Sequence, residues 1–295
     1  MIVRNYLNYI GSKDRYLPQI LSLLETGAAK TGGTSLIDLC CGSAVVGLNA
    51  AKYFRRVKCI DACKELILIH KYVQDSKSSD ELLANVDKVI KQFDLSKENK
   101  EGFLELRNHY NNIVTCTGHV LPVVLYCLIM HSFNYSLHIN KKGEYNAPFG
   151  KNRSSFNNSI RKKLINWKEE LDKRPGVEFI CKDFKSILPT TKSVIFVDPP
   201  YSASLSKHPY RVGNISWKEE EDRKLFDLLD FLDESGHLFV FTNVTSNNGV
   251  TNLPLVNWIH EHNYKCTPIN VNYNNCNYQR KNNGSTVEVI ISNFE

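Results

Sequence analysis

The chain has 295 residues, of which 42% are hydrophobic and 23% charged, as in an ordinary globular protein. This length fits one large domain, or a core with a smaller second part. The formal net charge of +6 suits a nucleic-acid partner but does not require one. Residues 1–6 do not begin a signal peptide, and the most apolar stretch, 120–130, is too short to span a bilayer. We therefore expect no membrane partner, and a buried helix at 120–130.

The nine cysteines indicate a reducing, cytoplasmic environment. Their number is odd, no Cys-x-x-Cys pair occurs, and no histidine accompanies them at zinc-ligand spacing. We therefore expect no metal and no disulfide framework. The cysteines are interpreted as small apolar side chains of the interior.

Five short apolar runs alternate with helical patterns along the chain. This alternation predicts an α/β fold built on a parallel sheet. Residues 219–232 are an example of an intervening helix. The expected strands lie at 36–39, 57–61, 177–180, 193–197 and 237–241.

The end of the chain departs from this alternation. Two strand-like runs, 269–273 and 286–292, flank an asparagine-rich turn. Such a pattern predicts an antiparallel hairpin that closes one edge of the sheet, so the final strand is reversed.

A long insertion separates the second and third strands. Residues 65–159 begin with charged, helical patterns, and 140–150 are rich in turn formers. A parallel sheet does not need so long an excursion. We expect a core formed by 1–64 and 160–295, and a mostly helical insertion with a hairpin at 65–159.

The first two strands end in residues that suit ligand binding. Open α/β sheets bind ligands at the carboxyl ends of their strands, and a glycine turn at 38–44 lets the backbone approach a ligand there. The turn lacks the further glycines of a dinucleotide fingerprint, and it could equally be an ordinary strand–helix turn. Asp61 ends the next strand, where an acid either binds the hydroxyls of a ribose or caps a helix.

The sequence Asp-Pro-Pro-Tyr at 198–201 directly follows the fourth predicted strand. Pro199 and Pro200 stiffen the turn and remove two backbone donors. The carboxylate of Asp198 and the carbonyl of Pro199 are pure acceptors, and Tyr201 adds a flat ring. Acceptors beside a stacking ring fit a nucleobase that bears an exocyclic amino group.

Taken in order, these motifs resemble the Dam-type (D12 class) family of DNA adenine N6-methyltransferases. The resemblance covers nearly the whole chain. It implies a Rossmann-like methyltransferase sheet with a reversed final strand and a helical target-recognition insertion. The matching segments are 9–13 with 17–18, 38–43, Asp61, 183–184, 198–201, 143–150 and 288–294.

The resemblance also implies a cofactor, S-adenosyl-L-methionine, and the residues that line its site. Lys13 is expected to neutralise the methionine carboxylate, which suits a lysine point charge. Asp61 is expected to bind the ribose, and Asp183 with Phe184 the adenine. The expected cofactor-binding residues are Tyr9, Gly11, Lys13, Asp38, Cys40, Gly42, Asp61, Asp183, Phe184 and Asp198.

The substrate implied by the resemblance is double-stranded DNA with a flipped adenine, because the target base cannot be reached inside a duplex. Tyr201 would stack on this base while Asp198 and Pro199 accept hydrogen bonds from N6. Phe133 would fill the gap in the duplex, although it could instead be a core aromatic. A basic cluster at 141–163 suits phosphates. The expected DNA-binding residues are Phe133, Asn134, His138, Lys141, Lys142, Pro148, Lys151 and Arg153.

Three positions depart from the family's pattern. Cys40 stands where phenylalanine is usual, and Ser43 replaces a glycine. His138 stands where members that recognise GATC have an arginine that contacts guanine. Histidine lacks the two-pronged donor fork of arginine, so we do not expect strict recognition of GATC.

Other functions remain open from sequence alone. The same acceptor turn suits cytosine N4, or adenine in RNA. A DNA-binding relative without catalysis is a further alternative, although it would not need to keep Asp198 and its turn. A cognate restriction endonuclease is a partner that the resemblance allows, in a cytoplasmic bacterial or phage setting.

Overall fold

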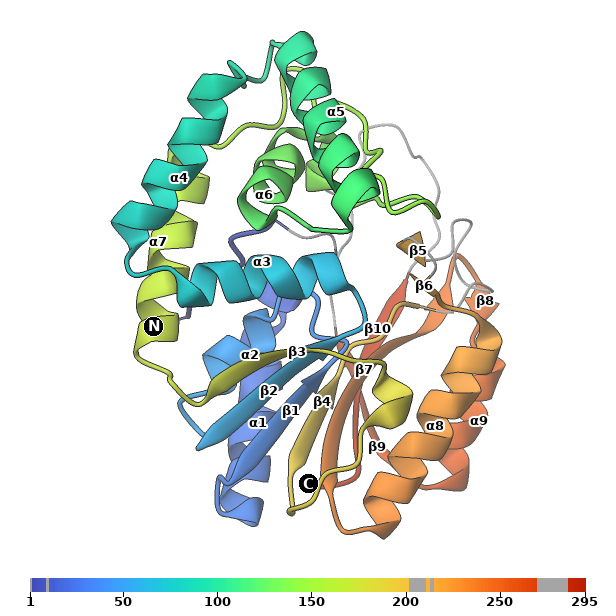
Figure 1. Cartoon of the computed structure of the whole chain (residues 1–295). Coiled ribbons are helices and arrows are strands. Elements are labelled where there is room, and N and C mark those ends of the chain that lie inside the picture. The colour runs from blue at the N-terminus through green and yellow to red at the C-terminus, as the bar shows by residue number, and fades with distance from the viewer. Residues whose placement is uncertain (1, 9–10, 202–210, 213–214, 270–285) are drawn as a thin grey trace.

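The computed structural model describes residues 2–8, 11–201, 211–212, 215–269 and 286–295. Its main sheet has the strand order β3-β2-β1-β4-β7-β10-β9. β10 is antiparallel to both β7 and β9, and the other pairings along this order are parallel. The predicted parallel sheet with a reversed final strand is therefore confirmed (Figure 1). Its strands are β1 (Ser35–Leu39), β2 (Arg56–Asp61), β3 (Val177–Cys181), β4 (Val194–Val197), β7 (Leu238–Asn247), β9 (Lys265–Ile269) and β10 (Val287–Ser292).

The five predicted parallel strands all form, and β7 continues past its predicted end to Asn247. The prediction at 269–273 was wrong in its start, because β9 begins at Lys265. Pro268 argues against a strand in sequence, but β9 is the last strand in the sheet order, and an edge strand tolerates proline. Residues 270–273 and the asparagine-rich turn lie outside the described residues.

Strand side chains alternate between two hydrophobic cores. Leu36 and Phe196 belong to the first core, whereas their neighbours Ile37 and Ile195 belong to the second. This period of two is what a strand buried on both faces requires. The helices on the first side are α1 (Leu17–Thr31) and α2 (Val45–Ala50), and those on the second are α8 (Glu219–Glu234) and α9 (Leu253–Glu261).

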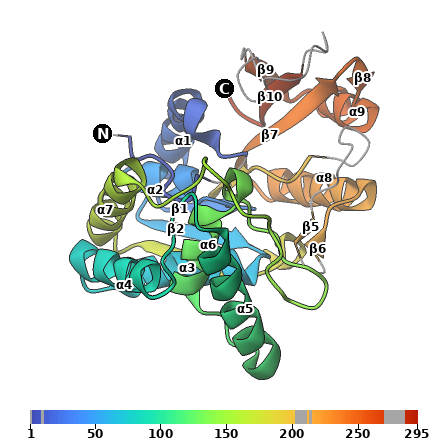
Figure 2. The ribbon, with the colours of Figure 1, turned by 90° about the horizontal axis from the view of Figure 1, so that it is seen from above.

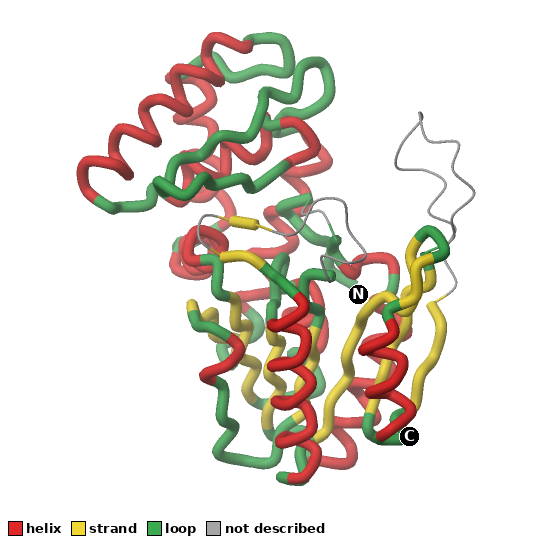
Figure 3. Tube along the Cα trace, turned by 90° about the vertical axis from the view of Figure 1, so that its right-hand side faces the viewer, coloured by secondary structure: helices red, strands yellow, loops and turns green. Residues whose placement is uncertain are grey.

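The inserted lobe stands over the carboxyl ends of the parallel strands (Figures 1 and 3). Its centre is α6, which packs against α3, α4 and α5 and is buried from Val124 to His131, as predicted for the apolar stretch. α3 contacts β2 and β3 as well as α6, so it joins the sheet to the lobe. The helices here are α3 (Lys64–Asp75), α4 (Ser79–Gln92), α5 (Lys100–Thr117), α6 (Pro122–His131) and α7 (Asn158–Asp172).

Short elements complete the structure. Within the described residues, no helix combines the length and the apolar character that crossing a membrane needs. The short elements are the 3-10 helices η1 (Lys13–Arg15), η2 (Phe133–Tyr135) and η3 (Phe184–Ser186), and the strands β5 (Arg211–Val212), β6 (Ile215–Ser216) and β8 (Val250–Thr251).

Candidate active site

The strand order reverses between β1 and β4, and this switch point defines the site. From β1 the chain proceeds outward through β2 and β3, and from β4 it proceeds to β7 on the other side. The loops that follow β1 and β4 therefore diverge at the carboxyl edge, which is where open α/β sheets form the crevice that binds their ligands. Asp198 starts the loop after β4, and its backbone N–H donates to the carbonyl of Leu39 at the end of β1, 3.4 Å away. The glycine turn at 38–44 and the motif at 198–201 are thus neighbours in the structure.

The turn after β1 has an unusual backbone. Cys40 and Ala44 adopt left-handed conformations with φ of 57° and 55°, and Gly42 lies between them at 49°. Such conformations are costly for residues other than glycine and persist where the surroundings enforce them. Gly42 is held from both sides: its N–H donates to Asp61 Oδ2 (2.9 Å), and its carbonyl contacts Nε2 of His70 (2.9 Å). The turn is thus fixed before any ligand arrives.

Asp61 and Asp38 both present acidic groups to this crevice. Asp61 Oδ1 also accepts from the N–H of Cys63 (2.8 Å), so two backbone donors orient its carboxylate. Asp38 Oδ2 accepts from the N–H of Gly47 (2.8 Å), but Oδ1 is buried without a hydrogen-bond partner among the described residues. Burial, and then Asp198 and Asp61, raise the pKa of Asp38, although the Gly47 bond opposes them. Among the described residues no positive side chain pairs with Asp38 or Asp61, so this concentration of acceptors fits a cationic, hydrogen-bond-donating ligand.

Lys13 contacts the turn at 198–201. Its Nζ lies 2.7 Å from Asp198 Oδ1, 3.4 Å from Glu288 Oε1 and 3.3 Å from the hydroxyl of Tyr201. That hydroxyl donates to Glu288 Oε1 (2.5 Å), and the Thr242 hydroxyl donates to Asp198 Oδ1 (2.8 Å). Burial opposes the charge of Lys13, but the two carboxylates more than compensate and raise its pKa. Lys13 therefore stays protonated and holds Asp198 in place.

Sequence reasoning did not assign a role to Glu288, yet it is central to this cluster. It is 1% exposed, on the reversed strand β10. A buried carboxylate is tolerated only with a charged or hydrogen-bonded partner, and Lys13 with Tyr201 supplies both. The available signal was a single acid within the apolar run 286–292. What the sequence could not provide was the partner, because Lys13 lies at the opposite end of the chain.

The remaining predicted cofactor residues lie in different settings. Gly11 has a φ of 84°, and its carbonyl accepts from Lys13 Nζ (3.3 Å). Asp183 is exposed and caps η3 by accepting from the N–H of Lys185 (2.9 Å). Phe184 is 6% exposed and packs on Trp217 with ring centroids 5.2 Å apart. Tyr9 lies outside the described residues.

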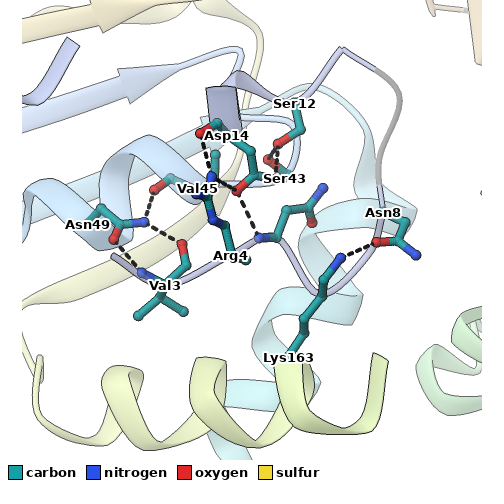
Figure 4. A network of polar contacts seen from close by, with 10 residues as sticks. Val3, Arg4, Asn8, Ser12, Asp14, Ser43, Val45, Asn49 and Lys163 are labelled. Atoms are coloured by element: carbon teal, nitrogen blue, oxygen red, sulfur yellow. Dashed lines mark hydrogen bonds and ion pairs between the residues drawn. The ribbon is translucent and has the colours of Figure 1, made fainter. Parts of the chain in front are cut away.

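The segment before Lys13 is anchored to α2 (Figure 4). The amide of Asn49 binds both the N–H and the carbonyl of Val3, at 2.8 and 2.9 Å. Ser12 and Ser43 bring their hydroxyl oxygens to 3.4 Å, so the segment also touches the turn after β1. This anchoring sets the position from which Lys13 reaches Asp198.

His70 is a second residue that sequence reasoning missed. It is fully buried on α3 and stacks on Phe179, with ring centroids 4.8 Å apart. Because the carbonyl of Gly42 can only accept, Nε2 carries the proton and Nδ1 accepts from the hydroxyl of Tyr6 (2.9 Å). Both ring nitrogens of a neutral imidazole are therefore satisfied. Burial lowers the pKa of His70 from 6.5 to about 4, although the hydrogen bond to the carbonyl of Gly42 opposes this shift.

This depressed pKa predicts a stability change in mild acid. Between pH 6.5 and about 4 the unfolded chain protonates His70 and the folded chain does not, so stability falls as the pH falls through this window. We expect the loss attributable to His70 to be on the order of 3 kcal/mol. The measurement is urea unfolding of wild type and His70→Gln across this pH range. The two curves should converge in acid, with the exposed His260→Gln as control, and parallel curves would contradict the assignment.

The predicted DNA-binding residues lie on one side of the inserted lobe, in the segment between α6 and α7. This segment reaches over the carboxyl end of the sheet toward β5 and β6 (Figures 1 and 2). Phe133 is 39% exposed, so its interpretation as a core aromatic was wrong. The guanidinium of Arg153 lies over its ring at 5.4 Å. The other predicted residues are also exposed, namely Asn134, His138, Lys141, Lys142, Pro148, Lys151 and Arg153.

The predicted basic cluster at 141–163 is not continuous. Arg161 on α7 forms an ion pair with Asp87 of α4, and Lys163 donates to the side chain of Asn8 (2.6 Å). The packing of α7 against α4 brings Arg161 to Asp87, whereas Lys163 reaches the N-terminal segment. Both side chains therefore have partners within the protein, and their contact with phosphates stays a prediction.

A parallel sheet with one reversed strand, and an acidic crevice at its switch point, define a Rossmann-like methyltransferase fold. Residues 9–267 match the family model described as D12 class N6 adenine-specific DNA methyltransferase. The chain belongs to this family.

Two relatives show how far this similarity extends. The modification methylase StsI of Streptococcus sanguinis is 32% identical over 99% of this chain, which spans 43% of that protein. The type II methyltransferase M.FokI of Planomicrobium okeanokoites is 30% identical over 99% of this chain, again spanning 43% of that protein. The chain thus spans less than half the length of either relative.

One solved structure is similar at a greater distance. The rRNA methyltransferase AviRa of Streptomyces viridochromogenes aligns with 94% of this chain and 84% of its own, at a TM-score of 0.40 and 13% identity. A likeness this remote says nothing about the substrate. Within the described residues, no three acidic, histidine or cysteine side chains gather as a metal site would require.

Proposed function

We propose that this chain transfers a methyl group from S-adenosyl-L-methionine to N6 of a specific adenine in double-stranded DNA. The observation that carries the proposal is the half-buried Asp198, held by Lys13 and Thr242 at the switch point of the sheet. The family of the chain supports the same reaction.

The chemistry of the crevice fits the proposed cofactor. S-adenosyl-L-methionine carries a sulfonium and an ammonium group, and supplies a methyl group activated by the positive sulfur. The unpartnered Oδ1 of Asp38 suits the ammonium, and Asp61 suits the ribose hydroxyls. Lys13 is already paired with two carboxylates. We therefore propose that Lys13 positions Asp198 instead of neutralising the methionine carboxylate.

The residues of the chain would act mainly by positioning. Asp198 and the carbonyl of Pro199 accept hydrogen bonds from the N6 amino group of a flipped adenine, and this orients the N6 lone pair. The ring of Tyr201 stacks on the base. Since Lys13 and Thr242 both bind Asp198 Oδ1, the acceptor is oriented before the base arrives. Preorganised contacts of this kind contribute much of an enzyme's rate acceleration.

The proposal is tested by methyl transfer from labelled S-adenosyl-L-methionine to matched substrates. These are a duplex DNA library, the same sequences as single strands, and duplex RNA. Digestion of the product to nucleosides should yield N6-methyladenine from duplex DNA in preference to the others. N4-methylcytosine, or a preference for RNA, would overturn the proposal. Cofactor binding without transfer to any substrate would favour a catalytically silent relative.

The exposed cations of the inserted segment provide a salt-dependent prediction. Lys142→Ala and Arg153→Ala should each weaken duplex binding without changing sequence preference, because phosphate contacts carry no base information. Each should reduce the slope of log affinity against log salt by about 0.9. Fluorescence anisotropy over a salt series measures this slope. Lys30→Ala is the matched control, since Lys30 is exposed at the end of α1 that precedes β1.

Its outcome separates two roles of the same residues. An unchanged slope with a changed preferred site would show that Lys142 and Arg153 read bases.

We further propose a cytoplasmic setting and a paired restriction endonuclease, because the relatives are named as modification methylases.

A further inference from the structure

The segment between α6 and α7 contains a short hairpin with a defined register. Ile139 and Tyr145 form an isolated antiparallel bridge. On one side of it the N–H of Asn140 donates to the carbonyl of Glu144 (2.9 Å), and on the other the N–H of Asn146 donates to the carbonyl of His138 (3.0 Å). His138 and Asn146 are therefore cross-strand neighbours.

The hairpin is fixed to α5 through Tyr145. Asn111 binds the backbone of Tyr145 twice: its Oδ1 accepts from the N–H (2.8 Å), and its Nδ2 donates to the carbonyl (3.0 Å). The Tyr145 hydroxyl donates to the carbonyl of Ser136 (2.8 Å), and the side chain is fully buried. Such fixing reduces the entropy lost when the hairpin binds a partner.

Alternation along the two strands decides which side chains face outward. Ile139, Tyr145 and Ala147 are buried beneath the hairpin, at 3%, 0% and 0% exposure. Their neighbours His138 and Asn146 are both exposed. A period of two places these two residues on the opposite, outer face. Lys141 and Lys142, in the turn of the same hairpin, are also exposed.

His138 and Asn146 are joined to each other by a side-chain hydrogen bond between Nδ1 and Oδ1. The amide oxygen accepts, so Nδ1 donates, and a neutral imidazole then keeps an acceptor at Nε2 while Asn146 keeps its Nδ2 donors. If the amide oxygen and nitrogen of Asn146 are exchanged, Nδ2 donates to Nδ1 of His138, and the donor and acceptor that remain change places between the two side chains. In either case the bond uses one donor and one acceptor, and one of the two side chains keeps a donor while the other keeps an acceptor.

This pattern is complementary to adenine in the major groove and not to guanine. Adenine presents the N7 acceptor beside the N6 donor, whereas guanine presents two acceptors, N7 and O6. Against guanine, the acceptor of the pair would face O6, which is also an acceptor, so no hydrogen bond could form there. We propose that His138 and Asn146 act together to read one adenine of the recognition site, at a base other than the one that is methylated. The proposal rests on the proposed function in duplex DNA.

The test selects bound duplexes from a randomised library, so that it does not depend on methyl transfer. Wild type should select adenine at one position by a factor between about 5 and about 150, as a bidentate contact allows. His138→Ala, Asn146→Ala and the double variant should all lose selectivity at that same position. Lys142→Ala should keep it. His138→Arg adds two adjacent donors and should move the preference toward guanine.

Base analogues locate the contact. Replacing the selected adenine by 7-deazaadenine removes N7 and should weaken binding by wild type but not by the double variant. Circular dichroism and thermal unfolding check that the exposed substitutions leave the fold intact. Guanine at the selected position, or relaxation at two different positions by the two single variants, would overturn the inference. A retained adenine preference without methyl transfer would instead contradict only the proposed function.

Discussion

Asp198→Asn should reduce methyl transfer to duplex DNA by ~10²–10³ while the protein stays folded. The amide keeps the size of the carboxylate and can still accept from the Thr242 hydroxyl. It loses the negative charge of the carboxylate, whose Oδ1 lies 2.7 Å from Lys13 Nζ. Because the hydrogen bond to N6 matters most as the amino group becomes positive, the loss should fall on turnover more than on duplex binding. Single-turnover transfer and anisotropy measure the two quantities separately.

A matched substitution shows whether this effect is local. Asp227→Asn removes an exposed carboxylate from α8 and should leave turnover unchanged. If well-folded Asp198→Asn retained near-normal turnover, Asp198 would not be the acceptor for N6. A loss confined to cofactor affinity would place Asp198 in the cofactor site alone.

Lys13→Met should lower the free energy of unfolding by about 3–5 kcal/mol at neutral pH. Met fills much of the same volume but removes the cation that lies 2.7 Å from Asp198 Oδ1 and 3.4 Å from Glu288 Oε1. Their side chains are 20% and 1% exposed, so solvent provides little screening at Glu288. Burial already raises the pKa of Asp198 above its usual value, although Lys13 opposes this, and removing Lys13 should raise it further.

The pH dependence of this loss follows from the raised pKa. A carboxyl group with a raised pKa in the folded state keeps its proton there, so its cost develops as the pH rises from the unfolded to the folded value. The difference between wild type and Lys13→Met should therefore shrink in acid. Urea unfolding at several pH values measures it. Adding Glu288→Gln to Lys13→Met should recover part of the stability, and Lys30→Met is the control on the surface.

A loss below about 1 kcal/mol would resemble that of a surface ion pair and would contradict the buried cluster. The same result would also weaken the role of Lys13 in fixing Asp198. Methyl transfer alone could not distinguish a lost ion pair from another change in the site, because any disturbance of the turn at 198–201 slows transfer. Stability and its pH dependence test the pairing itself.

Sequence alone predicted the features that arise from local patterns. Apolar runs of strand length identified β1, β4 and β7, because burial on both faces demands continuous apolar side chains. In β2 and β3 apolar residues alternate with exposed charged ones, and this period of two identified them. The motif at 198–201 was recognisable because two prolines end a strand wherever they occur. The buried helix α6 followed from an apolar stretch too short for a membrane.

Tertiary structure decided which residues meet. Glu288 joins Lys13 only because β10 runs antiparallel between β7 and β9 and returns the end of the chain to a position beside β7. His70 supports Gly42 only because α3 packs back over β2 and β3. Hydrogen bonds and ion pairs depend on distances in space, which no local sequence pattern encodes. The same reason explains why the pairing of Arg161 with Asp87, and that of His138 with Asn146, emerged only from the structure.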